Sequence, residues 1–281
     1  MKNMSSWEDF TPSIIKPATY VYKYRHKINE FLVKTRVKLK FSVSPHILVL
    51  GRGGVGKTVL LDHISDEASS KEWQLPDTST TTELKTAELG EWYKIIAIAP
   101  GQNTLERRKA VDDALNTKNN LQGIIYLTDF GYTEIRHEGL KDELIQKGLT
   151  DIESIRKKNL DLEFDEFDLF LNFLENSILN NRGPKWLIIG VNKIDLYFDH
   201  LSEARKYYDP ECNGKFRDRI EKLYSQIGRH KLEIICLPVC SLNEPFSWNN
   251  LEVTSKINST MLSKNYLKAF IDQIGLLLDK K

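Results

Sequence analysis

The chain has 281 residues, of which 41% are hydrophobic and 28% are charged, so its composition is that of a globular protein and excludes a disordered or fibrous one. Its 40 Lys and Arg nearly cancel its 39 Asp and Glu, and the net charge of +1 gives the chain as a whole no attraction to nucleic acid or acidic membranes. Three cysteines are too few for a disulfide framework, which favours a reducing compartment.

The N-terminal segment, residues 1–44, is predicted to be a basic extension of the main domain. Residues 11–45 contain eight Lys and Arg against one acid, a local charge of +7, and aromatic residues lie between these charges. Such a mixture suits an acidic protein, an anionic lipid or a nucleic acid, and it equally suits an edge strand or a packed helix with outward basic residues. No stretch resembles a signal peptide or reaches the ~18 apolar residues of a membrane span, so we expect a cytoplasmic protein without a transmembrane segment.

Residues 45–281 are predicted to form the main domain, which opens with an apolar strand, a glycine-rich turn and a helix. The turn reads G-x-x-x-x-G-K-T and consists of Gly51, Arg52, Gly53, Gly54, Val55, Gly56, Lys57 and Thr58. Its glycines allow successive backbone N–H groups to surround phosphate oxygens at angles and distances that a Cβ would prevent. Lys57 supplies positive charge to the β and γ phosphates, the Thr58 hydroxyl suits Mg²⁺, and the helix N-terminus adds its positive dipole end.

A β-hairpin is predicted next, with strands at 84–89 and 92–98 on either side of Gly90. An apolar run at 123–128 predicts a further strand that ends at Asp129. Residues 160–179 then show helical periodicity. Their acidic stretch, 161–168, predicts the beginning of that helix, where the dipole favours carboxylates, in preference to a metal site.

The buried strand predicted at 185–191 ends in N-K-I-D, residues 192–195. A carboxylate at Asp195 can accept two hydrogen bonds, from the N1–H and the 2-amino group of guanine, and adenine lacks this pair of donors. Lys193 can lay its alkyl stem over the purine, and Asn192 can tie this loop to the phosphate loop. Another strand at 233–239 and amphipathic helices around 216–227 and 262–277 complete the pattern.

Together, the phosphate loop and the N-K-I-D sequence resemble those of the Ras-like and ADP-ribosylation-factor-like small GTPases, and the resemblance covers roughly residues 45–280. It implies a three-layer α/β/α P-loop GTPase fold with a mostly parallel central sheet, and it implies GTP or GDP with Mg²⁺ as cofactors. Within the run 78–82, it makes Thr80 and Thr81 the candidates for the switch threonine that contacts Mg²⁺ and the γ-phosphate. It also places the backbone of Ser241 and Leu242 beside guanine O6.

The family's D-x-x-G-Q sequence corresponds to residues 98–102, which read I-A-P-G-Q. The resemblance implies that the Gly101 N–H bonds the γ-phosphate and that Gln102 is the catalytic residue that orients the attacking water. Ile98 stands where the family has a carboxylate that holds a Mg²⁺-bound water, and an isoleucine cannot do this. Asp129 is another acid at a strand end, but its strand is expected to lie farther from the phosphate loop.

Residues 131–159 exceed what the family needs between these elements and are predicted to form an insertion on the nucleotide-facing side. The candidate surfaces for a protein partner are the switch regions, this insertion and the basic arm at 11–45. No motif places an arginine as a catalytic finger, and Arg107 and Arg108 are interpreted as helix surface.

Three functional hypotheses follow from these patterns. The first is a guanine-nucleotide switch that binds GTP and GDP with Mg²⁺ and hydrolyses GTP slowly or with a stimulating partner. The second, motivated by Ile98, is a hydrolysis-deficient, nucleotide-bound scaffold that works as a protein-interaction module. The third, an ATP-using P-loop enzyme, requires the N-K-I-D match to be accidental.

Overall fold

The computed structural model describes Trp7 and residues 45–70, 72–76, 81–89, 92–101, 105–116 and 121–280. Residues 11–44 of the predicted basic arm lie outside this part of the chain, as do Thr80 and Gln102. Trp7 is buried, and its backbone carbonyl accepts a hydrogen bond from the Tyr266 hydroxyl at 3.4 Å. The N-terminal extension is therefore attached to the core at this one described position.

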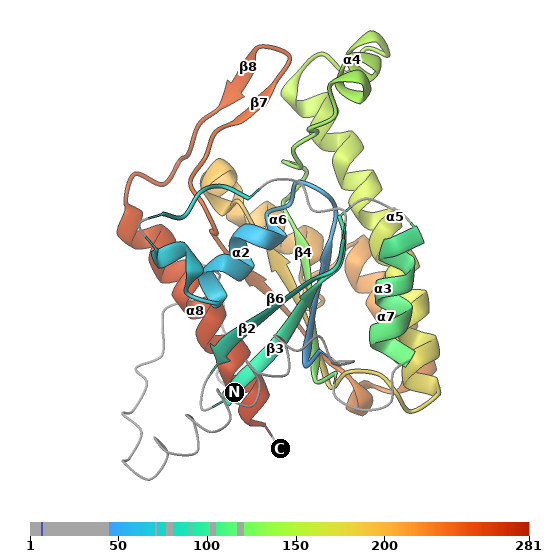
Figure 1. The fold of residues 1–281 in the computed structure, drawn as a ribbon. Helices are drawn as coiled ribbons and strands as arrows, with labels where there is room; N and C mark the ends of the chain where they lie inside the picture. The colour runs from blue at the N-terminus through green and yellow to red at the C-terminus, as the bar shows by residue number, and fades with distance from the viewer. Residues whose placement is uncertain are drawn as a thin grey trace.

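The centre of the fold is a six-stranded sheet (Figure 1). Its strands, in spatial order, are β2 (Glu83–Leu89), β3 (Trp92–Ile98), β1 (Ile47–Gly51), β4 (Gly123–Thr128), β5 (Trp186–Val191) and β6 (Glu233–Pro238). All neighbours pair in parallel except β2 and β3, which form the predicted antiparallel hairpin. The strands β1, β4 and β5 are buried along their whole length, as expected for parallel strands that are covered on both faces.

Helices cover both faces of this sheet. One face carries α2 (Lys57–Ile64) and α8 (Thr260–Asp279), and the other carries α3 (Leu105–Asn116), α5 (Ile152–Leu179) and α7 (Lys215–Ile227) (Figure 1). The remaining elements are α4 (Glu138–Gln146), α6 (Leu201–Tyr208), the short 3₁₀ helices η2 (Glu67–Ser69), η3 (Ile194–His200) and η4 (Arg229–Lys231), and a hairpin of β7 (Phe246–Trp248) and β8 (Leu251–Val253). The predicted fold class, three α/β/α layers around a mostly parallel sheet, is confirmed.

Helix α5 differs from its sequence-based prediction. It begins at Ile152, not at residue 160, because the Asp151 side chain caps it by accepting a hydrogen bond from the Ser154 N–H at 2.8 Å. The acidic stretch 161–168 therefore lies inside the helix and not at its N-terminus. Some of these acids turn inward, and Glu163 is almost fully buried. The same shift makes residues 152–159, predicted to belong to the insertion, the first two turns of α5.

Two general expectations can be compared with the described residues. None of the helices among them is long and apolar enough to cross a membrane. Cys212, Cys236 and Cys240 are all free thiols, and the last two are buried.

Candidate functional site

The predicted site segments meet at one edge of the sheet. The phosphate loop follows β1, Gly101 comes shortly after β3, Asn192 follows β5, and Ser241 comes shortly after β6. These strands run parallel, so their carboxyl ends all lie at the same edge, which is where α/β proteins bind ligands. Figure 1 shows this edge below α4 and the β7–β8 hairpin.

The phosphate loop is tightly enclosed by the rest of the chain. Gly54 has a φ of 86°, and a Cβ at this position would lie 2.4 Å from the Glu134 carbonyl oxygen. Gly101 is equally close on another side, since a Cβ there would lie 2.4 Å from Gly53 Cα. Real Cβ atoms do not approach other heavy atoms so closely, so these two places require glycine. Backbone from the insertion and from the segment after β3 thus rests directly on the loop.

Lys57 lies inside this loop and is buried. Its Nζ donates to the Gly51 and Arg52 carbonyls, at 2.9 Å each. Burial, and after it the charge of the Arg107 guanidinium, lowers the pKa of Lys57 to about 7, against the opposing charges of Glu166, Glu83 and Asp129. A polyanion bound beside Lys57 would favour the charged form of its amine. Thr58 follows in the first turn of α2 and is half-buried.

Arg52 takes a different direction from the one expected for a phosphate-binding side chain. Its guanidinium donates to the Asn159 Oδ1 at 3.2 Å and forms an ion pair with Glu166 at 3.4 Å. Both partners belong to α5. The side chain of Arg52 is thus directed at α5, and its backbone is the part that belongs to the loop.

Asn192 ties the loop after β5 to the phosphate loop, as its sequence position suggested. Its Nδ2 donates to the Val55 carbonyl at 2.9 Å. Its Oδ1 accepts from both the backbone N–H and the hydroxyl of Ser241, at 3.0 Å each. One buried amide therefore holds three loops together, while Leu242, the next residue, is half-buried at the rim of the same region.

Asp195 is completely buried, with an exposed fraction of 0%. Its Oδ1 accepts a hydrogen bond from the Cys240 thiol at 3.5 Å, whereas its Oδ2 has no hydrogen-bond partner within the described part of the chain. Burial raises the pKa of Asp195 to about 6. The Cys240 thiol and the Ser255 hydroxyl lower the pKa of Asp195 and so oppose this shift. The Ser255 hydroxyl itself donates to the Ile257 carbonyl at 3.3 Å. An unpartnered buried acceptor is costly, so Asp195 suits a ligand that brings N–H donors.

Lys193 links the loop after β5 to both the phosphate loop and the insertion. It has a φ of 58°, and its Nζ donates to the Gly54 carbonyl at 2.8 Å and to the Tyr132 carbonyl at 2.5 Å. The same Nζ forms an ion pair with the buried Asp129 at 2.9 Å, and Asp129 also accepts from the Thr133 hydroxyl at 2.7 Å. Asp129 is thus engaged beside β4, which lies across β1 from Ile98, and it does not replace an acid at position 98.

Ile98 ends β3 with 2% of its surface exposed. Glu83, the first residue of β2, is its partner in the antiparallel register. Residues directly opposite each other in such a pair place their side chains on the same face. The carboxylate of Glu83 is also one of the charges that favour the protonated form of Lys57. An acid therefore stands beside Ile98 on the neighbouring strand.

The sequence reasoning missed Glu83, although a signal was present. A two-residue connection at 90–91 pairs Leu89 with Trp92, and this register then pairs Glu83 with Ile98. Thr81, one candidate for the switch threonine, is exposed just before β2. The described residues contain no group of three or more His, Cys, Asp or Glu side chains that could hold a metal ion. Thr58 and Glu83 carry oxygen donors of the kind that Mg²⁺ takes.

The insertion is anchored over this site by buried polar contacts. The carboxyl of Glu163, in α5, accepts from the Gly131 N–H at 3.1 Å and from the Tyr208 hydroxyl. Burial raises the pKa of Glu163 well above its ordinary value, and the neighbouring Asp129 carboxylate raises it further. Asn159 donates to the Gly131 carbonyl at 2.9 Å. These contacts fix the path of the insertion as it crosses the phosphate loop.

The β7–β8 hairpin, which the sequence reasoning did not predict, joins the insertion from the other side. Trp248 Nε1 donates to the Leu149 carbonyl at 2.7 Å, and the Phe246 ring packs edge-on against Tyr132 with a centroid distance of 5.4 Å. The hairpin comes after the loop that carries Ser241, so that loop, the hairpin and the insertion form one connected cover.

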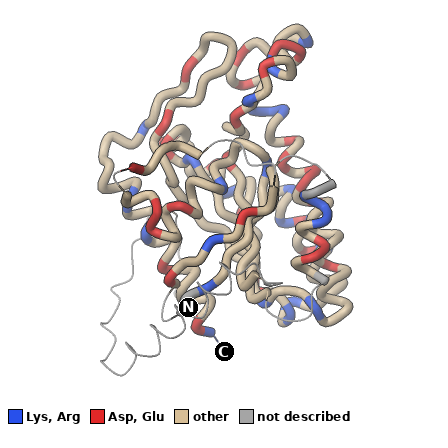
Figure 2. Tube along the Cα trace, in the orientation of Figure 1, with Lys and Arg blue, Asp and Glu red and all other residues tan. Residues whose placement is uncertain are grey.

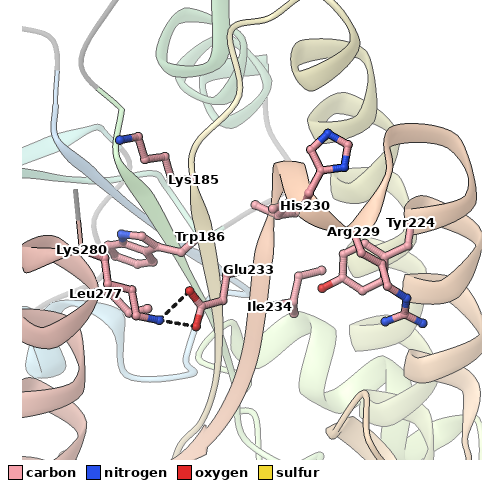
Figure 3. A pocket seen from close by; sticks show the side chains of 10 residues that line it. Lys185, Trp186, Tyr224, Arg229, His230, Glu233, Ile234, Leu277 and Lys280 are labelled. Carbon is pink, nitrogen blue, oxygen red and sulfur yellow. Dashed lines mark hydrogen bonds and ion pairs between the residues drawn. The ribbon is translucent and has the colours of Figure 1, made fainter. Parts of the chain in front are cut away.

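A separate hollow lies at the opposite edge of the sheet (Figure 3). Its volume is about 470 Å³, and it lies at the amino ends of β5 and β6, where Lys280 pairs with Glu233. None of the predicted site residues lines it. The hollow is therefore distinct from the candidate site.

No protein-family model and no curated protein sequence matches this chain. Among solved structures, the chain is similar to the signal recognition particle receptor SRb-GDP from Chaetomium thermophilum, with 13% identity and a TM-score of 0.39, over 73% of this chain and 93% of that one. It is also similar to Toc33 from Arabidopsis thaliana in complex with GDP and Mg²⁺, with 10% identity and a TM-score of 0.44, over 94% of this chain and 97% of that one. Both likenesses are distant, and the fold assignment rests on the strand order and layers of this chain.

Proposed function

We propose that this protein binds GTP and GDP at the edge formed by the phosphate loop, Asn192 and Asp195. The observation that carries the proposal is the buried, unpartnered Oδ2 of Asp195, in a loop that Asn192 holds against the phosphate loop. A carboxylate in that setting accepts from two adjacent N–H donors, which guanine offers and adenine does not. Lys57 and the loop amides then hold the phosphates, and the backbone of Ser241 and Leu242 lies beside the base.

The test of base choice uses the chemistry of position 195. Wild-type protein is titrated with GDP, ADP and XDP, and Asp195→Asn is titrated with the same three nucleotides. We expect wild type to prefer GDP, and we expect the variant to prefer XDP, because an amide donates to the 2-oxo group of xanthine where a carboxylate accepts from the 2-amino group of guanine. A preference for ADP, or an unchanged GDP preference in the variant, would contradict the guanine assignment and favour an ATP-using enzyme.

We further propose that Mg²⁺ accompanies the nucleotide and is held by Thr58, the phosphates and one of the switch threonines, Thr80 or Thr81. When bound, Mg²⁺ neutralises phosphate charge. Glu83 offers the nearby carboxylate that Ile98 does not supply. Measuring how fast a fluorescent GDP dissociates with and without excess EDTA tests this part of the proposal, since an ion in the site slows release.

In the switch hypothesis, GTP is hydrolysed slowly, Gln102 orients the water, and the switch regions, the insertion or the basic arm contact a protein partner. The apolar Ile98 favours the alternative, a scaffold that holds nucleotide without hydrolysing it. Single-turnover hydrolysis of GTP by wild type and by Gln102→Ala separates the two. A rate that falls on substitution supports an enzyme, and equal background rates support the scaffold.

A further inference from the structure

The sequence position of Arg107 suggested that it lies on the helix surface. The structure shows that it does not. It belongs to the first turn of α3, and only 8% of its surface is exposed, whereas its neighbour Arg108 is exposed. Burying a guanidinium is costly unless it is paired, so its contacts indicate what this part of the fold is built to hold.

The contacts of Arg107 connect three segments. Its Nη1 donates to the Gly101 carbonyl at 3.5 Å and forms an ion pair with Glu166 in α5. The other oxygen of Glu166 forms the ion pair with Arg52 in the phosphate loop at 3.4 Å. One carboxylate thus bridges an arginine of the phosphate loop and an arginine of α3. Figure 2 shows that acidic and basic residues occur along both α3 and α5.

This cluster lies close to the place where a terminal phosphate would be held. A Cβ on Gly101 would lie 2.7 Å from Lys57 Nζ, so the residue that carries the Arg107 contact touches the phosphate-binding lysine. After burial, the Arg107 charge is the largest influence that lowers the pKa of Lys57. Lys57 and Arg107 therefore lie close enough for their charges to repel each other, although the carboxylates of Glu166, Glu83 and Asp129 oppose the effect on Lys57. An additional anionic charge would be stabilised there.

The structure also provides room for Arg107 to move. A cavity of about 220 Å³ lies between α3 and α5 beside the Arg107–Glu166 pair. It is mostly apolar and is lined by Leu50, Val111, Leu169, Phe170 and Phe173 in addition to the charged residues. A shift of α3 over this space would not have to break close packing.

We propose that Arg107 is the residue that distinguishes GTP from GDP, by exchanging its ion pair with Glu166 for the γ-phosphate. The inference rests on the proposed function. GDP leaves the Arg107–Glu166 pair intact, because its phosphates end at Lys57. The third phosphate of GTP competes with Glu166 for the guanidinium, and the movement of Arg107 carries α3 and the adjoining Gly101 segment with it. The charge of Arg107 thus contributes to the affinity for GTP only.

The experiment measures the affinities of the full chain for GDP and for the non-hydrolysable β,γ-imido analogue of GTP. Arg107→Ala should lower the affinity for the analogue by about tenfold or more, the size expected for a lost hydrogen bond to a charged group, and change the affinity for GDP by less than about twofold. Arg108→Ala is the matched control, since it removes an exposed arginine at the next position and should leave both affinities unchanged. An equal loss for both nucleotides, or no loss for either, would overturn the inference.

A second variant keeps the test decisive if Arg107→Ala does not fold. Glu166→Gln removes the competing carboxylate, so the ratio of analogue affinity to GDP affinity should rise by a few-fold. An unchanged or smaller ratio contradicts the exchange. The two proposals fail in different ways: if wild type binds neither nucleotide, the proposed function falls, and if GDP binds but the ratio is the same in the variants, only the role of Arg107 falls.

Discussion

The two ends of the candidate site are built differently. At the base end, the side chains of Asn192, Asp195 and Ser241 are buried, and direct hydrogen bonds tie the loops together. At the phosphate end, charges dominate: Arg52 and Arg107 both pair with Glu166 close to Lys57, and the apolar Ile98 is buried at the end of β3. The base end is thus preorganised by direct hydrogen bonds, whereas the phosphate end is held by ion pairs whose balance would change with the ligand in the proposed exchange. Under the proposed function, selection of guanine would rest on fixed hydrogen bonds and the response to a third phosphate would rest on charge.

The largest effect is expected from breaking the preorganised end at Asn192. Asn192→Ala leaves the Val55 carbonyl and the Ser241 N–H without their buried partner, and each unsatisfied group costs about 1–3 kcal/mol. We expect the free energy of unfolding to fall by about 3 kcal/mol or more and nucleotide binding to be lost. Chemical denaturation measures the first quantity. Asn176→Ala, at an exposed position of α5, is the control and should change stability by less than about 0.5 kcal/mol.

The pH dependence of GDP affinity distinguishes the two ends. Asp195 must be ionised to accept from guanine, and its pKa is raised to about 6, so affinity should fall about tenfold per unit as the pH drops below 6. Lys57 must be charged to hold phosphate, and its pKa in the free protein is lowered to about 7, so affinity should also decline above pH 7. Asp195→Asn, titrated with XDP, should lose the acidic limb and keep the alkaline one. An acidic limb that persists unchanged in the variant would assign it to another group.

Lys57 and Asp195 also make the free energy of unfolding depend on pH, in the direction opposite to their effect on GDP affinity. The pKa of Lys57 is lower in the folded chain than its ordinary value of 10.5, so the unfolded chain binds more protons between about pH 7 and 10.5. Lys57 therefore makes the free energy of unfolding of the nucleotide-free protein rise with pH over that range. For Asp195 the folded pKa is raised, so stability falls as the pH rises from about 4 to 6. Each residue contributes to binding in its charged form, and the same charged form destabilises the nucleotide-free fold.

A smaller effect is expected from restoring the missing acid at the phosphate end. Ile98→Asp places a carboxylate beside Glu83, whose charge acts on Lys57, and we expect Mg²⁺ to slow GDP release about tenfold more than it does in wild type. Glu83→Gln should weaken the Mg²⁺ effect, because it removes the only charge of that register pair. Dissociation of fluorescent GDP across a Mg²⁺ titration reports both variants. If Ile98→Asp leaves the Mg²⁺ dependence unchanged, the ion does not lie at this position.

The smallest effect concerns the cover over the base end. Trp248→Phe removes the hydrogen bond to the Leu149 carbonyl but keeps an aromatic ring, so stability should fall by about 1 kcal/mol. If the hairpin and the insertion act as one cover, GDP should also dissociate a few-fold faster. Ser247→Ala, on the exposed face of the same strand, should alter neither quantity. A stability loss without any change in GDP release would limit the hairpin to a structural role.

Several features of the site could be predicted because they depend on neighbouring residues in the chain. The turn from Gly51 to Thr58 is a local backbone conformation, and a strand before it and a helix after it have their own periodicities. The N-K-I-D sequence is also local, and its position after a buried strand placed it at the correct edge of the sheet. The hairpin of β2 and β3 was recognisable from its alternating residues and short turn.

Other features depended on contacts between residues far apart in the sequence. The residues around Arg107 have the composition of a helix surface. Only the position of Glu166, 59 residues later, makes Arg107 a buried residue that is linked to the phosphate loop. The early start of α5 at Asp151 and the path of the insertion past Gly54 are likewise settled by packing. Patterns within a segment determine which elements form, because propensity and periodicity act locally. Which charges face one another is decided by the tertiary structure, since it requires the packing of several elements at once.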